Sequence, residues 1–142
     1  PELVRNLAPV KSPTPDLLPK IARSGQTIDV TPSAEFAAAH VPGTINVPLN
    51  MLVQWAGFFV DYDKPLHLIA EPTALPEALK RLRSIGIDNV CGSFDAGAVQ
   101  AAGLRTESYR SETPQQLNER IAAGAVKLLD VRAATEFQEG HI

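Results

Sequence analysis

Residues 28–49, IDVTPSAEFAAAHVPGTINVPL, decide the fold. Apolar residues predict a strand at 27–30, and the threonine and proline that open the segment 31–39 predict a short helix there. The tract Val-Pro-Gly-Thr at 41–44 suits a type II turn, because proline fits its second position and glycine its third. A second strand is predicted at 45–47. Strand, helix and strand in this order indicate a βαβ unit, from which parallel sheets are built.

The flanking sequence predicts the rest of an α/β domain, a small parallel sheet covered by helices on both faces. A helix with a threonine cap and a proline in its first turn is expected over 14–25. The near-continuous apolar run at 66–70 has the length of a strand buried on both faces, so we expect the central strand there. Apolar residues recur at helical spacing over 75–85. A last short strand at 89–91 should precede a glycine-bounded turn and a small helix that ends near Gly103.

The composition is that of a globular protein rather than a disordered one, with 44% hydrophobic and 20% charged residues in a chain of 142. The formal net charge is -3 and no basic stripe is present to attract nucleic acid. The longest apolar stretches fall far below the roughly 20 residues needed to span a bilayer, and no signal-peptide pattern opens the chain. We therefore expect a cytoplasmic protein with neither nucleic acid nor a membrane among its partners.

Cysteine and histidine are scarce. A single cysteine, Cys91, excludes an internal disulfide framework and a cysteine zinc cluster. The three histidines, His40, His67 and His141, are far apart in the sequence and lack the spacing of metal ligands. The sequence therefore predicts no metal site and no cofactor.

The opening stretch recurs near the C-terminus. In the same order, Asp29-Val30, Glu35-Phe36 and His40 reappear as Asp130-Val131, Glu136-Phe137 and His141. The period of about 100 residues is a domain length, whereas solenoid repeats run to about 20–50 residues. A tandem pair is therefore predicted. Its parts are a linker from a missing upstream domain at 1–12, a complete domain at 13–105, a linker at 106–112 and the N-terminal part of a second domain at 113–142.

The repeated residues resemble the rhodanese-like family of sulfurtransferases. Such domains open with a D-V-R, E-[FY] and G-H-I-P-G-A-x-N-[IV]-P series, to which Ile28-Asp29-Val30, Glu35-Phe36 and residues 40–49 are similar. The second copy matches through Leu129-Asp130-Val131-Arg132, Glu136-Phe137 and Gly140-His141-Ile142. Residues 82–90 resemble the family's helix and "LGFDNV" strand, and residues 97–103 its closing helix. The resemblance implies a rhodanese-like fold for 13–105 and a setting in sulfur-transfer chemistry.

A finer resemblance concerns residues 48–57 together with 62–66. These tracts are similar to rhodanese-like modules that follow a metallo-β-lactamase-type hydrolase domain, in fused proteins related to persulfide dioxygenases. The resemblance implies that residues 1–10 are the tail of such a hydrolase. It also implies that the partners of this segment are other domains of the same polypeptide.

The resemblance places a catalytic cysteine just after the central strand, in a loop whose backbone N–H groups hold an anion at a helix N-terminus. The corresponding residues here are Ala70, Glu71, Pro72, Thr73, Ala74 and Leu75. Ala70, or Glu71 after a slip of one residue, aligns with the cysteine, and neither can carry sulfur. Pro72 has no N–H to donate, and Glu71 adds a negative charge. The loop also lacks the arginine with which many members hold the anion, so we predict a degenerate, non-catalytic loop.

Two features outside this loop could suggest a site. Cys91 has no lysine, arginine or histidine close in sequence to lower its pKa, so we expect a small buried residue rather than a reactive thiol. Trp55, Phe58 and Phe59 could line a ligand pocket. A connector packed under a loop is the favoured interpretation.

Seven residues of the repeated motif are expected to form a structural framework: Asp29, Glu35, His40, Asp130, Arg132, Glu136 and His141. The two histidines should end helices, where an imidazole can bond the last carbonyl groups. Asp29 and Glu35 could instead form a carboxylate pair for acid–base catalysis. In the family, however, this glutamate pairs with the arginine of D-V-R, for which the second copy has Arg132 and the first has Thr31.

Two functions remain open. The favoured one is a catalytically inactive rhodanese-like module with a structural or docking role in a multidomain sulfur-transfer or persulfide-processing protein. The alternative is a segment of an active thiosulfate or persulfide sulfurtransferase, whose cysteine lies beyond residue 142 in the second domain. A cysteine phosphatase of the same fold would also need the absent nucleophile. The apolar face between residues 117 and 137 should pack on the first domain, pair with a second copy of the chain as a homodimer, or be poorly ordered.

Overall fold

The computed structural model describes residues 8–141. The chain forms two compact units, Pro1–Arg110 and Ser111–Ile142. Most of the linker predicted at 1–12, and the last residue of the predicted second domain, lie outside the described residues. Between residues 8 and 141, no helix is both long enough and apolar enough to cross a membrane.

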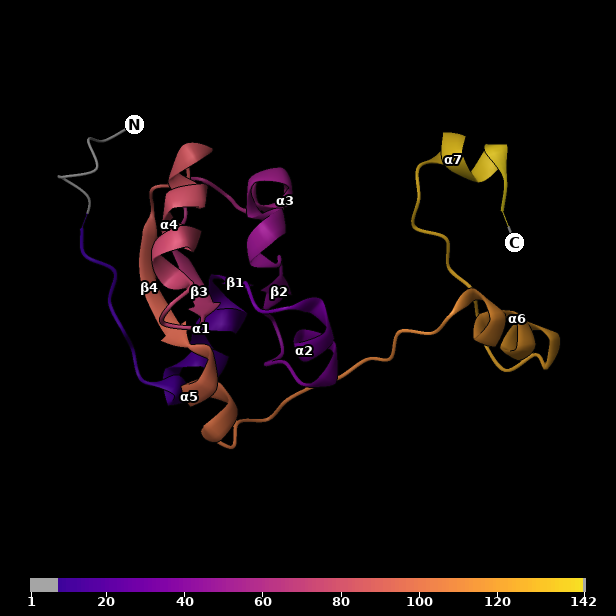
Figure 1. Cartoon of the computed structure of the whole chain (residues 1–142), viewed down its shortest axis with the longest axis horizontal. Helices are drawn as coiled ribbons and strands as arrows, with labels where there is room; N and C mark the ends of the chain where they lie inside the picture. The colour runs from indigo at the N-terminus through magenta and orange to yellow at the C-terminus, as the bar shows by residue number, and fades with distance from the viewer. Residues whose placement is uncertain (1–7, 142) are drawn as a thin grey trace. The chain divides into compact units, whose positions relative to one another are not determined.

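A four-stranded parallel sheet forms the centre of the first unit (Figure 1). Its strands are β1 (Gln26–Asp29), β2 (Ile45–Asn46), β3 (Leu66–Ala70) and β4 (Val90–Asp95), in the order β2-β1-β3-β4. β3 pairs with β1 on one side and with β4 on the other, and all of these pairings are parallel. The predicted central strand is therefore confirmed.

Helices connect the strands. They are η2 (Pro15–Leu17), a 3-10 turn, then α1 (Leu18–Ser24), α2 (Ser33–Ala38), η3 (Leu49–Met51), α3 (Leu52–Phe59), α4 (Leu75–Ser84) and α5 (Ala96–Ala101). The helix predicted over 14–25 thus begins as a 3-10 turn. Neither Thr14 nor Thr31 caps a helix with its side chain, which corrects both predicted caps. The hydroxyl of Thr31 donates to Asp29 instead.

The core consists of two clusters on opposite faces of the sheet. One contains Leu52 and Ala56 of α3 with Ala78 and Leu82 of α4, and the other contains Leu18 and Ala22 of α1 with Ala96 of α5. β3 contributes Leu68 to the first cluster and Ile69 to the second, because successive side chains of a strand point to opposite faces. The predicted α/β class, a small parallel sheet with helices on both faces, is confirmed.

The turn before β2 forms as the sequence predicts. Thr44 N donates to Val41 O at 3.2 Å, and Gly43 has a φ of 89°. A Cβ atom at Gly43 would also lie only 2.9 Å from the carbonyl oxygen of Ala22. Glycine is therefore required here both by backbone conformation and by close packing on α1.

The strand β4 is longer than predicted. The expected glycine-bounded turn does not form, because Gly92 lies inside the strand, where a Cβ atom would meet the His67 ring at 2.8 Å. Glycine is needed for this close approach rather than for a turn. α5 follows β4 directly, and Asp95 Oδ1 caps it by accepting from Gly97 N at 2.9 Å and from Ala98 N at 3.3 Å.

α3 was not predicted from the sequence. Its buried face consists of Leu52 and Ala56, one turn apart, whereas Trp55, Phe58 and Phe59 are 41%, 78% and 50% exposed. The prediction that these three aromatic residues pack under a loop is wrong. Gln54 is the one polar side chain of the tract, so periodicity alone could not identify the side that packs on the sheet.

Both flanking segments of the first unit contact the sheet or its helices. Lys11 forms a parallel bridge with Gly92, in which Lys11 N donates to Cys91 O at 3.1 Å. In the predicted linker 106–112, Glu107 forms an antiparallel bridge with His40. Backbone hydrogen bonds therefore hold these parts of the predicted linkers to the domain.

The second unit contains α6 (Pro114–Ala122) and α7 (Ala134–Glu139). A capping box of Thr113 and Gln116 starts α6. The apolar segment 128–131 carries no ladder, and among the described residues of this unit no strand is formed. Leu129 and Val131 are 81% and 86% exposed. A lone segment has no neighbouring strand with which to form a ladder, so residues 128–131 stay unpaired.

Candidate functional site

The site lies at the carboxyl ends of β1 and β3. From β1 the chain passes to β2 on one side, and it then returns to β3 on the other side. This reversal makes the gap between β1 and β3 a topological switch point, which is where open α/β sheets bind ligands. A cavity of about 490 Å³ opens there.

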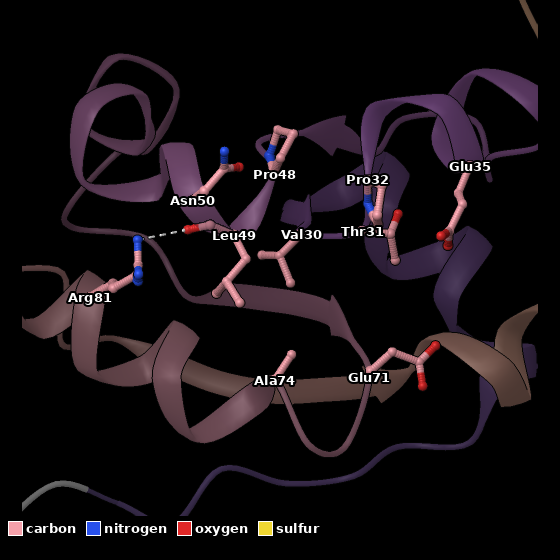
Figure 2. Close-up of a pocket in the computed structure, with 10 residues that line it drawn as sticks. All are labelled: Val30, Thr31, Pro32, Glu35, Pro48, Leu49, Asn50, Glu71, Ala74 and Arg81. Carbon is pink, nitrogen blue, oxygen red and sulfur yellow. Dashed lines mark hydrogen bonds between the residues drawn. The ribbon is translucent and has the colours of Figure 1, made fainter.

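The loops that follow three strands line this cavity (Figure 2). The lining residues are Val30, Thr31 and Pro32 after β1, Pro48, Leu49 and Asn50 after β2, Glu71 and Ala74 after β3, Glu35 of α2 and Arg81 of α4. Most of the lining is apolar. In Figure 2, Arg81 lies at one end of the cavity, and Glu35 and Glu71 lie at the other.

The loop after β3 is the one for which the sequence predicts a degenerate active site. Ala70 ends the strand and is 2% exposed, so its side chain is part of the core. Ala74 N and Leu75 N both donate to Glu71 O, at 2.9 and 3.1 Å. Pro72 has no N–H. Three of the loop's backbone positions therefore have no free N–H group to offer an anion.

The charges around this cavity also disfavour an anion. Glu71 and Glu35 are both exposed and line the space. Arg81 lies at the other end of the space, where its guanidinium already has partners, because Nε donates to Glu77 Oε1 at 2.8 Å and Nη1 to Leu49 O at 3.4 Å. The cavity is thus an apolar space with acidic residues at one end.

A second cavity, of about 360 Å³, surrounds the end of β1. Asp29 lines it and is only 7% exposed. Asp29 Oδ1 accepts from Thr31 N at 2.9 Å and from Thr31 Oγ1 at 2.5 Å. Burial raises the pKa of Asp29 above its ordinary value, although the bonds from Thr31 act against this shift. Glu35 lines this cavity too, so the structure brings the two predicted carboxylates to one space.

His40 holds the end of α2. Its Nδ1 atom lies 2.9 Å from Phe36 O, and its ring stacks on Phe36 with centroids 4.1 Å apart. His40 N donates to Glu107 O at 2.9 Å, and Glu107 N donates back to His40 O at 2.8 Å. These contacts join the helix end to the segment that leaves the domain.

Cys91 lies near the amino end of β4, whereas the loop after β3 lies at the carboxyl ends of the strands. Leu66 pairs with Val90 and His67 with Gly92, so Cys91 is the extra residue of a bulge. Its Sγ atom lies 3.4 Å from His67 Nε2, a neighbour that sequence proximity could not indicate. Burial raises the pKa of the Cys91 thiol and lowers the pKa of His67, so a neutral pair is favoured near pH 7.

In the second unit, Arg132 pairs with Asp130. Its Nη2 atom donates to Asp130 Oδ2 at 2.6 Å and to Gly140 O at 2.9 Å, and Nε donates to Asp130 Oδ1 at 3.0 Å. Hydrogen bonds from the guanidinium lower the pKa of Asp130 to about 2. The expected pairing of Arg132 with Glu136 is wrong, because Glu136 Oε2 instead accepts from Ala133 N at 3.0 Å. His141 repeats the contact of His40, with Nδ1 2.8 Å from Phe137 O.

Within residues 8–141, no group of three or more histidine, cysteine, aspartate or glutamate side chains is arranged to hold a metal ion. No protein-family model matches the sequence. No curated protein matches it either.

Solved structures do resemble the chain. The rhodanese-like domain of the Alr3790 protein from Anabaena shares 19% identity, over 87% of this chain and 90% of that one, with a TM-score of 0.58. The single-domain sulfurtransferase RDL2 of Saccharomyces cerevisiae shares 22% identity, over 68% and 93%, with a TM-score of 0.56. A metallo-β-lactamase from Staphylococcus aureus shares 22% identity, over 66% of this chain and 26% of that chain, with a TM-score of 0.53. At these identities the likeness concerns architecture alone, and the chain has the rhodanese-like fold.

Proposed function

We propose that this segment is a rhodanese-like module without sulfurtransferase activity, with a structural or docking role in a multidomain sulfur-transfer or persulfide-processing protein. The observation that carries the proposal is the loop after β3. It contains no cysteine, and two of its N–H groups donate to Glu71 O. Sulfur transfer needs a thiolate that attacks the donor and an electropositive pocket that stabilises the thiolate and binds the anionic donor.

Cys91 is a poor substitute for the missing nucleophile. It lies four residues along β4 from Asp95, the partner of Ala70, which is roughly 13 Å at the rise of a strand. Its pKa is raised by burial, and a protonated thiol is a weak nucleophile. Cys91 thus lies near the amino ends of the strands, whereas the cavity lies at their carboxyl ends.

A multidomain setting has separate support. The Staphylococcus aureus metallo-β-lactamase resembles this chain over only 26% of its own length, as expected if a module of this fold is one part of that larger protein. The partners we propose are other domains of the same polypeptide, in a cytoplasmic protein. The exposed apolar segment 128–131 is a second contact surface, through which we propose that the chain forms a homodimer when no such domain covers it.

Thiosulfate and cyanide provide the test, since sulfur transfer between them yields sulfite and thiocyanate. We expect the chain to give thiocyanate at the uncatalysed rate, and Cys91→Ser to leave that rate unchanged. We also expect Glu71→Cys to restore no turnover, because the loop's N–H groups remain bonded to the carbonyl of residue 71. Turnover by the unaltered chain that disappears in Cys91→Ser would contradict the proposal. An active rhodanese serves as the positive control.

A further inference from the structure

The turn at Asp29 and the turn at Asp130 are closed by the same kind of hydrogen bond. Thr31 N donates to Asp29 Oδ1 at 2.9 Å, and Arg132 N donates to Asp130 Oδ1 at the same distance. In each turn a carboxylate oxygen of the aspartate therefore accepts from the backbone N–H group two residues on. The side chain two residues on is different, since one is a hydroxyl group and the other a guanidinium.

The helices that follow these turns end in the same way. Phe36 stacks on His40 with centroids 4.1 Å apart, and Phe137 stacks on His141 at 3.9 Å, both at an interplanar angle of 12°. The residue before each histidine also matches, since Ala39 has φ -162° and ψ 121° and Gly140 has φ 169° and ψ 133°. The two helix ends are equivalent in backbone and in aromatic contact.

In residues 130–141, the aspartate turn and the helix end together bind the guanidinium of Arg132. Arg132 donates to both carboxylate oxygens of Asp130 and to the carbonyl oxygen of Gly140. The corresponding groups in the first segment are Asp29 and the carbonyl of Ala39. Both of these residues line the cavity of about 360 Å³.

Both carboxylates of the first segment lack the partners that their counterparts have. Asp29 Oδ2 accepts no hydrogen bond from residues 8–141, because Thr31 is too short to reach both oxygens. Glu136 caps its helix by accepting from Ala133 N, but the residue equivalent to Ala133 is Pro32, which has no N–H. The carboxylate of Glu35 therefore cannot cap its helix in this way, and it lines the cavity instead.

We infer that the cavity beside Asp29 is a binding site for a guanidinium group, supplied by the arginine side chain of a partner segment. Asp29, 7% exposed, would accept the planar group edge-on, Ala39 O would accept a further N–H, and Glu35 would add a second negative charge. Among residues 8–141, no lysine or arginine lines this cavity, and His40 is the one titratable group in its lining besides Asp29 and Glu35. A charged ligand would thus meet two acids and no fixed cation.

Burial is the main cause of the raised pKa of Asp29, and the nearby Glu35 carboxylate raises it further. The cavity is also larger than a guanidinium group needs, which leaves room for the aliphatic stem of an arginine. That stem would contact Val99 and Leu104, which are part of the lining.

The test is a titration of the full chain followed by amide NMR, with methylguanidinium and an acetylated, amidated Gly-Arg-Gly peptide as the two probes. The Thr31 amide reports directly, because its N–H group is bonded to Asp29. We expect a saturating shift at Thr31 in the millimolar range and no such shift with tetramethylammonium at equal ionic strength. We expect both probes to bind, since the peptide carries an arginine side chain; binding of methylguanidinium without the peptide would overturn the partner segment and assign the cavity to a free small guanidinium compound.

Two variants make the result decisive. Thr31→Arg should supply the guanidinium from within the chain and weaken binding of either probe at least tenfold. Glu35→Gln, an exposed position that should not affect folding, should weaken it about threefold. Glu119→Gln in α6 is the matched control, with unchanged affinity expected. Shifts that grow linearly without saturation, or equal affinities in the unaltered chain and Thr31→Arg, would overturn the proposal. Failure here leaves the proposed lack of sulfurtransferase activity untouched, because no residue of the loop after β3 is involved.

Discussion

Residues 29–40 and residues 130–141 share one local design and differ at the residue that follows the Asp-Val pair. The aspartate turn, the stacked phenylalanine and histidine, and the histidine bond to the helix carbonyl occur in both. In the first region burial raises the pKa of Asp29, whereas in the second the guanidinium of Arg132 lowers the pKa of Asp130 to about 2. The frame is therefore maintained by backbone bonds and aromatic contacts, and the ion pair is a separable addition to it.

The aromatic contact gives the largest expected effect. Phe36 is 6% exposed and Phe137 is 40% exposed. Phe36→Ala should lower the free energy of unfolding of the first unit by about 3–5 kcal/mol, the usual cost of removing a buried aromatic side chain. Phe137→Ala should leave that transition within about 0.5 kcal/mol of the unaltered chain. Urea unfolding followed by the fluorescence of Trp55, which belongs to the first unit, measures both. Equal losses of unfolding free energy for the two variants would show that the difference in burial between Phe36 and Phe137 has no effect on stability.

Thr31 and Arg132 occupy equivalent positions, and exchanging their side chains tests why the pKa values of Asp29 and Asp130 differ. Arg132→Thr should move the pKa of Asp130 from about 2 toward the ordinary value of 3.8, because its bonds from the guanidinium are lost. Thr31→Arg should lower the pKa of Asp29 by placing a cation beside it. Carboxyl carbon shifts followed by NMR against pH measure both groups. An unchanged Asp130 after Arg132→Thr would break the comparison, since it would assign the low pKa to another cause.

The smallest effect is a pH dependence. The pKa of Asp29 is raised on folding, so the folded chain holds this proton at pH values where the unfolded chain has released it. The contribution of Asp29 to stability is therefore greatest below pH 3.8 and falls as the pH rises through the folded pKa. Asp29→Asn should remove that fall. The measurement is the unfolding midpoint at a series of pH values from 3.5 upward, and parallel curves for the two chains would contradict the expectation.

The elements with clear periodicity or turn chemistry could be predicted from the sequence. The run at 66–70 gave the central strand with its observed limits, and the Pro-Gly pair gave the turn before β2. α3 could not be predicted, because a tract with a single polar side chain, Gln54, does not reveal which side is buried. Gly92 indicated a turn, although the close approach of the His67 ring is what requires glycine there.

The site shows the same division. The loop after β3 and the framework residues were predicted from contiguous motifs, and the structure places that loop beside a cavity and places His40 and His141 on the carbonyl groups of Phe36 and Phe137. The sequence missed the neighbour of Cys91, because the contact with His67 depends on the register of β3 against β4 and on a bulge between them. It also assigned Arg132 to the wrong carboxylate. A separation of two residues brings Arg132 to Asp130, whereas Glu136 is engaged by the start of its own helix.

The edges of the sheet have a consequence for how the first unit behaves at high concentration. Open strand edges are templates on which other chains can add, and they lead to aggregation. Here β2 is only two residues long, and the outer side of β4 is partly covered by the bridge to Lys11. A lysine beside one edge and a very short strand at the other leave little room for a foreign strand to align, so the sheet is protected against polymerisation through its own backbone.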